Sequence, residues 1–115
     1  MGCDLCYPHA MTESDTQVRN RLRTSLRQAY GERLQRAVLF GSRARGDARP
    51  DSDYDVAIFL KDFHSFVTEA GRLAEISTDI LHDTNVVINA LPFPANAWED
   101  RTGLMHEIRR EGVEL

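Results

Sequence analysis

The first periodic stretch of the chain predicts an amphipathic helix. Ser14 and Gln17 have the spacing of a capping box, which marks a helix start, and Gly31 marks its end. The apolar residues between them recur at helical spacing: Val18, Leu22, Leu26 and Ala29. The opposite face carries four arginines between positions 19 and 27. We interpret this basic face as solvated helix surface rather than as a binding patch.

Two short apolar runs in the middle of the chain predict buried strands. Residues 37–40 form a continuous run that stops at Gly41, the pattern of a central strand covered on both faces. Residues 43–52 are polar and include a glycine and a proline, which indicates a turn-rich connector. A second apolar run, residues 56–60, follows two closely spaced aspartates.

The rest of the chain predicts a helix, a strand and a final helix. Asp62 or Ser65 can cap the second helix, whose apolar positions form a broad core-facing stripe. Residues 84–91 alternate and are rich in β-branched side chains, which predicts a strand that two prolines then break. A last helix starts near Asn96 and ends at Gly112. Its inward-facing residues are Trp98, Met105 and Ile108.

Composition limits the class of protein. A chain of 115 residues is long enough for one domain with one modest core. Its 42% hydrophobic and 28% charged residues are typical of soluble globular proteins, and no apolar segment reaches the roughly 20 residues of a membrane span. A net charge of -4 argues against non-specific coating of nucleic acid. With no signal-peptide pattern at the start, we expect a cytoplasmic protein without a membrane or sequence-specific nucleic-acid partner.

The first thirteen residues are predicted to be a flexible extension of a domain that spans residues 14–115. Cys3, Cys6 and His9 have the spacing of three metal ligands. A structural zinc site normally needs four ligands, and the chain has no other cysteine. We therefore favour a loosely ordered extension over a zinc or redox site.

The two aspartates that open the second apolar run carry the candidate chemistry. Side chains alternate in a strand, so Asp53 and Asp55 project from the same side. Two carboxylates placed together repel each other unless a cation lies between them. Mg²⁺ suits such a pair, because it binds one or two carboxylates and completes its shell with water and substrate phosphates. For an isolated pair of aspartates, the alternative interpretation is that both residues cap the start of the strand or lie solvated at a sheet edge.

The spacing of these residues resembles a known signature. Gly41-Ser42, then ten residues, then Asp53-x-Asp55 resembles the motif of the nucleotidyltransferase superfamily related to DNA polymerase beta. Residues 41–59, GSRARGDARPDSDYDVAIF, look like its small single-domain members, the minimal nucleotidyltransferases. The resemblance implies an α+β fold, with a short mixed β-sheet and helices packed on one face. It also implies Mg²⁺-dependent transfer of a nucleoside monophosphate, AMP from ATP, onto a hydroxyl with release of pyrophosphate.

The resemblance assigns roles around the triphosphate as well. Asp53 and Asp55 would bind two Mg²⁺ ions, and the Gly41-Ser42 turn would hold the triphosphate. Arg43 and Arg45 follow in the same loop. Two interpretations of these arginines stay open: they neutralise phosphate charge, or they balance the acids of their own loop.

Relatives of this kind usually carry a third carboxylate near the start of the strand after the second helix. The position that aligns most directly is Thr84, flanked by Asp83 and Asn85. We take Asp83 as the candidate third metal ligand and catalytic residue. A local cap at the helix–strand junction is an equal alternative for it.

The small size of the chain predicts a partner, because one such domain leaves no room for a separate acceptor-binding domain. In stand-alone relatives the partner is commonly a helical protein of the HEPN class, often an RNA-cleaving toxin. The resemblance therefore implies an antitoxin that attaches AMP to a hydroxyl of that toxin. The alternatives are a transferase for a small-molecule acceptor and a degenerate binding module that neutralises its partner by contact alone.

Overall fold

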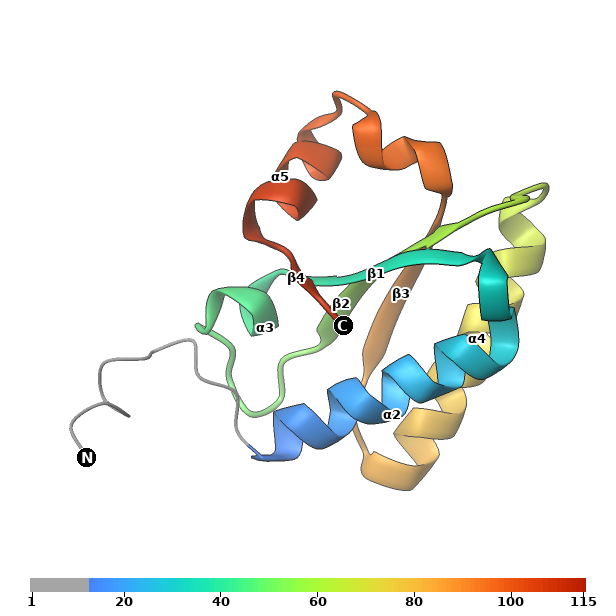
Figure 1. The fold of residues 1–115 in the computed structure, drawn as a ribbon. Coiled ribbons are helices and arrows are strands. Elements are labelled where there is room, and N and C mark those ends of the chain that lie inside the picture. The colour runs from blue at the N-terminus through green and yellow to red at the C-terminus, as the bar shows by residue number, and fades with distance from the viewer. Residues whose placement is uncertain (1–12) are drawn as a thin grey trace.

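The computed structural model describes residues 13–115 (Figure 1). Cys3, Cys6 and His9 lie outside the described residues, so their interpretation and that of the N-terminal extension stay predictions. The elements follow in this order along the chain: α2 (Glu13–Tyr30), η1 (Gly31–Arg33), β1 (Leu34–Phe40), α3 (Ser42–Arg45), β2 (Tyr54–Leu60), α4 (Phe66–Thr84), β3 (Ile88–Pro94), η2 (Ala95–Glu99), α5 (Gly103–Glu111) and β4 (Val113–Glu114). None of the helices in this range has the length and apolarity needed to cross a bilayer.

The four strands form one mixed sheet in the order β3-β2-β1-β4. β1 pairs antiparallel with β2 and with β4, while β2 and β3 run parallel. The helix α4 makes the crossover that a parallel pair requires. The α+β fold with a short mixed sheet, predicted from the resemblance, is confirmed.

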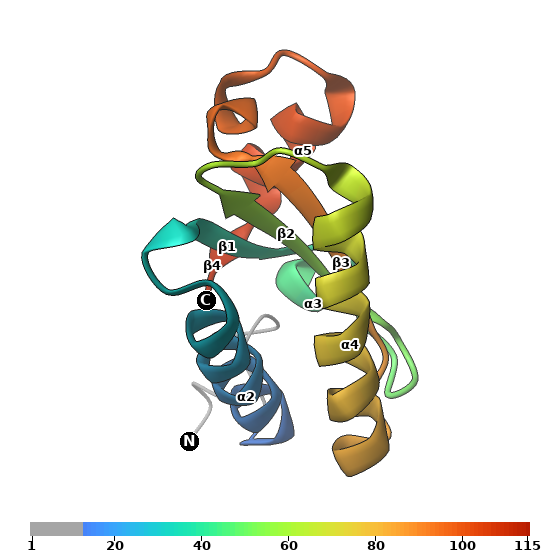
Figure 2. The same ribbon diagram turned by 90° about the vertical axis from the view of Figure 1, so that its right-hand side faces the viewer.

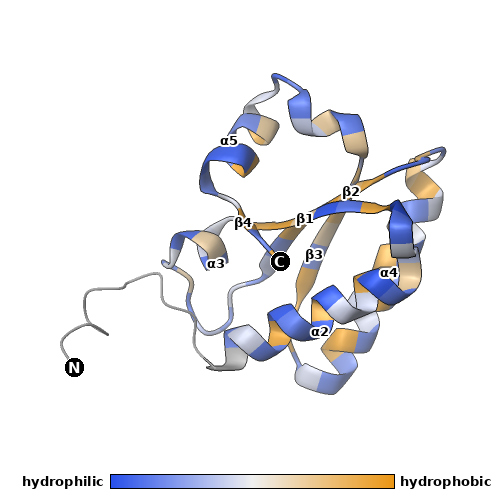
Figure 3. Cartoon of the chain, viewed as in Figure 1, coloured by the Kyte–Doolittle hydropathy of each residue, from blue (hydrophilic) through white to orange (hydrophobic). Residues whose placement is uncertain are grey.

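The two long helices pack side by side on one face of the sheet (Figure 2). Their apolar stripes meet alternate residues of β2 in the larger core cluster. Figure 3 shows hydrophobic and hydrophilic residues alternating along both helices. The buried members of this cluster are Val18, Leu22, Leu26, Tyr30, Leu39, Tyr54, Val56, Ile58, Leu60, Leu73, Ile80 and Ile88. Burial of this apolar surface is the main source of stability.

The opposite face of the sheet is covered only in part. A smaller cluster there joins the intervening residues of β1 and β2 to η2 and α5: Val38, Phe40, Ala57, Phe59, Ala97, Met105 and Ile108. Trp98 packs edge-on against the ring of Phe59, with centroids 5.4 Å apart, which agrees with a packing role. Asp53 and Asp55 share the strand parity of this face.

Several boundaries differ from those predicted. A single turn of helix, α3, replaces the start of the predicted connector. The predicted last helix is two elements, and Thr102 rather than Asn96 caps α5 by accepting from Met105 N. β3 begins at Ile88 rather than at residue 84 and includes both prolines. Proline is tolerated there because β3 is an edge strand.

Candidate active site

The turn at the end of β1 requires a glycine. Gly41 has φ 76° and ψ -156°, a backbone conformation that is strongly unfavourable for any residue with a Cβ atom. A Cβ atom there would lie 2.5 Å from Asp55 Oδ2. The missing side chain of Gly41 therefore makes room for the Asp55 carboxylate, and Ser42 follows directly as the first residue of α3.

The two aspartates lie where β2 begins, on one side of the strand. Asp53 precedes β2 and is exposed, while Asp55 is half-buried and pairs with Phe40 of β1. One nitrogen, Asn89 Nδ2, donates to an oxygen of each carboxylate. These two oxygens are therefore no more than two hydrogen-bond lengths apart. Sequence reasoning placed Asp53 and Asp55 together, and the structure does the same.

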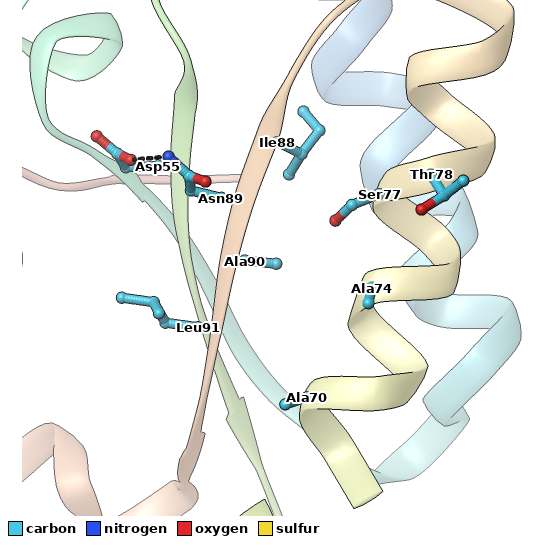
Figure 4. Close-up of a pocket in the computed structure, with 9 residues that line it drawn as sticks. All are labelled: Asp55, Ala70, Ala74, Ser77, Thr78, Ile88, Asn89, Ala90 and Leu91. Carbon is cyan, nitrogen blue, oxygen red and sulfur yellow. Dashed lines mark hydrogen bonds between the residues drawn. The ribbon is translucent and has the colours of Figure 1, made fainter. Parts of the chain in front are cut away.

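Asn89 is the residue that the sequence analysis missed. Its Nδ2 donates to Asp53 Oδ2 at 2.9 Å and to Asp55 Oδ1 at 3.3 Å. It stands opposite Asp55 in the parallel register of β2 and β3, and Figure 4 shows it turned toward Asp55, away from α4. The third position of the site is therefore filled by an amide.

The structure does not bring Asp83 to this pair. Asp83 lies in the last turn of α4, where its carboxylate forms an ion pair with Arg21 at 2.7 Å and is 59% exposed. Residues 13–115 contain no group of three or more histidine, cysteine or acidic side chains that could hold a metal ion. The assignment of Asp83 as a third ligand needs correction, because α4 continues to Thr84 and the strand starts later than predicted.

Arg43 is held by the protein itself. Its guanidinium donates to the carbonyl oxygen of Ser52 at 2.9 and 3.2 Å and to that of Pro50 at 3.1 Å. It also pairs with Asp15 at 3.3 Å and lies 4.4 Å from the centre of the Tyr54 ring. These contacts fasten the loop between α3 and β2, so Arg43 has a structural explanation that needs no phosphate.

Tyr54 belongs to the same cluster. Its hydroxyl donates to Asp15 Oδ1. Burial, followed by the hydrogen bond and the charge of Asp15, raises the pKa of Tyr54 to about 12. The hydroxyl therefore stays protonated at neutral pH, and the cluster ties α2 to the entrance of β2.

Arg45 is more available than Arg43. Its side chain is 41% exposed and pairs with Asp47 at 3.2 Å and with Glu111 at 3.4 Å. Hydrogen bonding and the charge of Asp47 raise the pKa of Arg45 above its ordinary value. Exposed ion pairs of this kind contribute little stability and exchange partners easily. Arg45 can therefore turn toward an anion at little cost.

A cavity of about 530 Å³ runs along the outer edge of β3 beside the aspartate pair (Figure 4). Asp55, Asn89 and Leu91 line one side. Small side chains of α4 line the other: Ala70, Ala74, Ser77 and Thr78. Asp55 thus borders an open space rather than a sealed interior.

The fold and the site define a class of protein. It is an α+β domain with a mixed sheet, in which a glycine turn at the end of β1 lies against one of two carboxylates at the start of β2. The model of the nucleotidyltransferase domain family matches residues 19–108. The chain therefore belongs to the nucleotidyltransferase domain family.

Individual relatives agree with this family. A protein of Methanocaldococcus jannaschii, named "putative protein adenylyltransferase", is 29% identical over 84 residues, which cover 73% of this chain and 81% of that protein. Among solved structures, a toxin-antitoxin with AMP-PNP has a TM-score of 0.63 at 20% identity, covering 84% of this chain and 70% of that one. A "putative nucleotidyltransferase" from Sulfolobus solfataricus has a TM-score of 0.54 at 16% identity, covering 91% and 88%. These structures show the same fold.

Proposed function

We propose that this nucleotidyltransferase moves AMP from ATP onto a hydroxyl of a partner protein, a HEPN-class toxin, and thereby acts as its antitoxin in the cytoplasm. The observation that carries the proposal is the placement of Asp53 and Asp55 on one side of β2, with Gly41 leaving room for the second carboxylate. The name of the M. jannaschii relative supports protein adenylylation, and the likeness to a toxin-antitoxin with AMP-PNP supports a toxin partner.

The residues present fit a magnesium site. Asp53 and Asp55 offer carboxylate oxygens close together, and carboxylates with water and phosphate oxygens are the ligands that Mg²⁺ prefers. Bound Mg²⁺ supplies charge neutralisation at the phosphates and lowers the pKa of the acceptor hydroxyl. We propose two ions at this pair, as the family resemblance implies.

The other residues act by positioning. Gly41 and Ser42 hold the triphosphate, because the turn brings backbone amides and a hydroxyl next to the aspartate pair. Arg45 can leave its exposed ion pairs to meet phosphate charge, whereas Arg43 keeps the loop in place. The acceptor oxygen forms a bond to the α-phosphorus, the bond to the β-phosphate oxygen breaks, and pyrophosphate leaves. The hydroxyl proton passes to solvent or to a base of the partner.

The test is transfer of label from α-³²P-ATP to the product of the neighbouring gene, in the presence of Mg²⁺. The wild type should label the partner, and Asp53→Asn/Asp55→Asn should not, although it keeps the shapes of both side chains. Asp79→Asn/Asp100→Asn is a matched control, because it removes two exposed charges elsewhere. Labelling by the aspartate-pair variant at the wild-type rate would contradict the proposal.

Neutralisation by contact alone is the second candidate, favoured by the amide at the position of the third carboxylate. A stable complex that suppresses the toxin but takes up no label would support it. Labelling of a small-molecule acceptor in place of the protein would support the third alternative.

A further inference from the structure

Asn89 contacts both members of the aspartate pair from the neighbouring strand. The register of β2 and β3 sets it opposite Asp55, and its amide nitrogen donates to one oxygen of each carboxylate. Figure 4 shows its side chain on the side of β3 that faces away from α4. A single side chain thus touches both carboxylates of the pair.

The requirements of folding do not explain this residue. Asparagine is depleted in β-strands, and Asn89 is exposed, so it fills no core position. Hydrogen bonds at an exposed position add little stability because water competes for both partners. An amide that bridges two like charges at this point has a clearer explanation in binding than in packing.

The chemistry of the amide allows two arrangements. Its nitrogen donates to the carboxylates in this structure, and its carbonyl oxygen sits on the same carbon. A half-turn about χ2, an angle that is broadly distributed in asparagine, exchanges the two atoms. The oxygen then faces the place between the carboxylates, and amide oxygens are ligands for hard divalent cations.

We propose that Asn89 is the third residue of the metal site, a neutral ligand that also holds Asp53 and Asp55 in position when no cation is bound. This inference rests on the proposed function, because it deepens the same site. It has two consequences. The protein binds a divalent cation more weakly than a site with three carboxylates does, since affinity follows the charge of the ligands. The acceptor hydroxyl also finds no carboxylate base at this position.

Metal binding by the full-length protein tests the inference without any measurement of activity. Mn²⁺ alone is titrated calorimetrically into the wild type, Asn89→Ala and Asn89→Asp. Asn89→Ala should raise the dissociation constant about tenfold, the lower end of the effect of losing a residue that orients metal ligands. Asn89→Asp should lower it about tenfold. Asn96→Asp, the same change at an exposed position of η2, should stay within twofold of the wild type.

The possible outcomes distinguish failure of the role inferred for Asn89 from failure of the proposed function. Circular dichroism and urea unfolding in EDTA first establish that each variant is folded. Saturable binding by the wild type that Asn89→Ala leaves unchanged would overturn the role of Asn89 and leave the proposed function standing. An effect of Asn96→Asp equal to that of Asn89→Asp would also overturn it, because net charge would then suffice. Absence of binding by the wild type would overturn the proposed metal dependence itself.

Discussion

Replacement of Gly41 by alanine should damage the fold and the aspartate pair at the same time. The backbone of Gly41, at φ 76° and ψ -156°, is one that alanine adopts only with strain. The new Cβ atom would also stand 2.5 Å from Asp55 Oδ2, far inside contact distance. The carboxylate is the end of a side chain, so it would move and give up its hydrogen bond from Asn89.

The expected cost has two parts of known size. The strained backbone contributes about 1–3 kcal/mol to the loss of unfolding free energy. Displacement of a charged hydrogen-bonding group contributes about 1 kcal/mol more, below the usual range of about 1.5–3 kcal/mol for charged groups because the pair faces solvent. Gly41→Ala should therefore cost about 2–4 kcal/mol, and a domain of this size can remain folded after such a loss.

A double-mutant cycle separates the two parts. Urea unfolding in EDTA is measured for the wild type, Gly41→Ala, Asp55→Ala and the double variant. In the Asp55→Ala background the carboxylate is gone, so Gly41→Ala should cost about 1 kcal/mol less than in the wild type. Gly71→Ala is the matched control: a Cβ atom at Gly71 meets no atom within 4 Å, and alanine is more favourable than glycine inside a helix by about 0.5–1 kcal/mol.

Equal costs of Gly41→Ala in both backgrounds would refute this reasoning. Such a result would mean that the carboxylate of Asp55 moves aside freely, and that Gly41 is needed only for its backbone conformation. The claim that the turn fixes the position of Asp55 would then fail.

Three other changes test separate contacts. Arg43→Gln should lower the unfolding free energy by about 1–3 kcal/mol in urea, because the loop carbonyls lose their charged donor; a change under about 0.5 kcal/mol would contradict this. Asp83→Asn should leave Mn²⁺ affinity within twofold in calorimetry, and a tenfold loss would return Asp83 to the metal site. Burial, more than any other cause, raises the pKa of Tyr54 and of Tyr30 to about 12, so both keep their protons between pH 10 and 12 while the unfolded chain loses them. Stability should therefore be complete below pH 10 and fall toward pH 12 by about 1–2 kcal/mol per tyrosine after solvent screening, and urea unfolding of Tyr54→Phe should show a smaller fall.

Local patterns in the sequence were sufficient to place the aspartate pair. Alternation along an extended chain puts Asp53 and Asp55 on the same side, and this geometry requires an extended backbone from Asp53, one residue before β2 begins. The glycine before Ser42 was also placed from local information, as the end of an apolar run. The close contact between Gly41 and Asp55 was beyond such reasoning, because it depends on how β1 and β2 pair.

The third position was missed because the end of α4 was misplaced. Asn85 has φ 62°, and its backbone amide donates to the carbonyl oxygen of Leu81, so it is the left-handed cap that ends the helix. Asparagine is, after glycine, a common residue for such a cap, and this signal was available in the sequence. A helix that ends at Asn85 moves the start of the strand to Ile88 and the residue beside Asp55 to Asn89.

The arginines of the loop show a different limit. Arg43 and Arg45 are alike in sequence, yet one is fastened by the carbonyls of its own loop and the other is exposed. Which arginine is fastened depends on where the loop closes and on the approach of Asp15 from α2, a contact of long range in the sequence. No local pattern separates two basic residues of the same turn.

Asp55 contributes both to the packing of the sheet and to the geometry of the proposed metal site. It pairs with Phe40 on one side and with Asn89 on the other, and its carboxylate fills the space that Gly41 leaves. A substitution at any of these positions therefore changes both the packing of the central strands and the place of a proposed metal ligand. Loss of activity alone cannot distinguish these effects. The distinction requires two measurements on each variant, unfolding in EDTA and Mn²⁺ affinity, because only a change in the ligand itself alters the second while leaving the first unchanged.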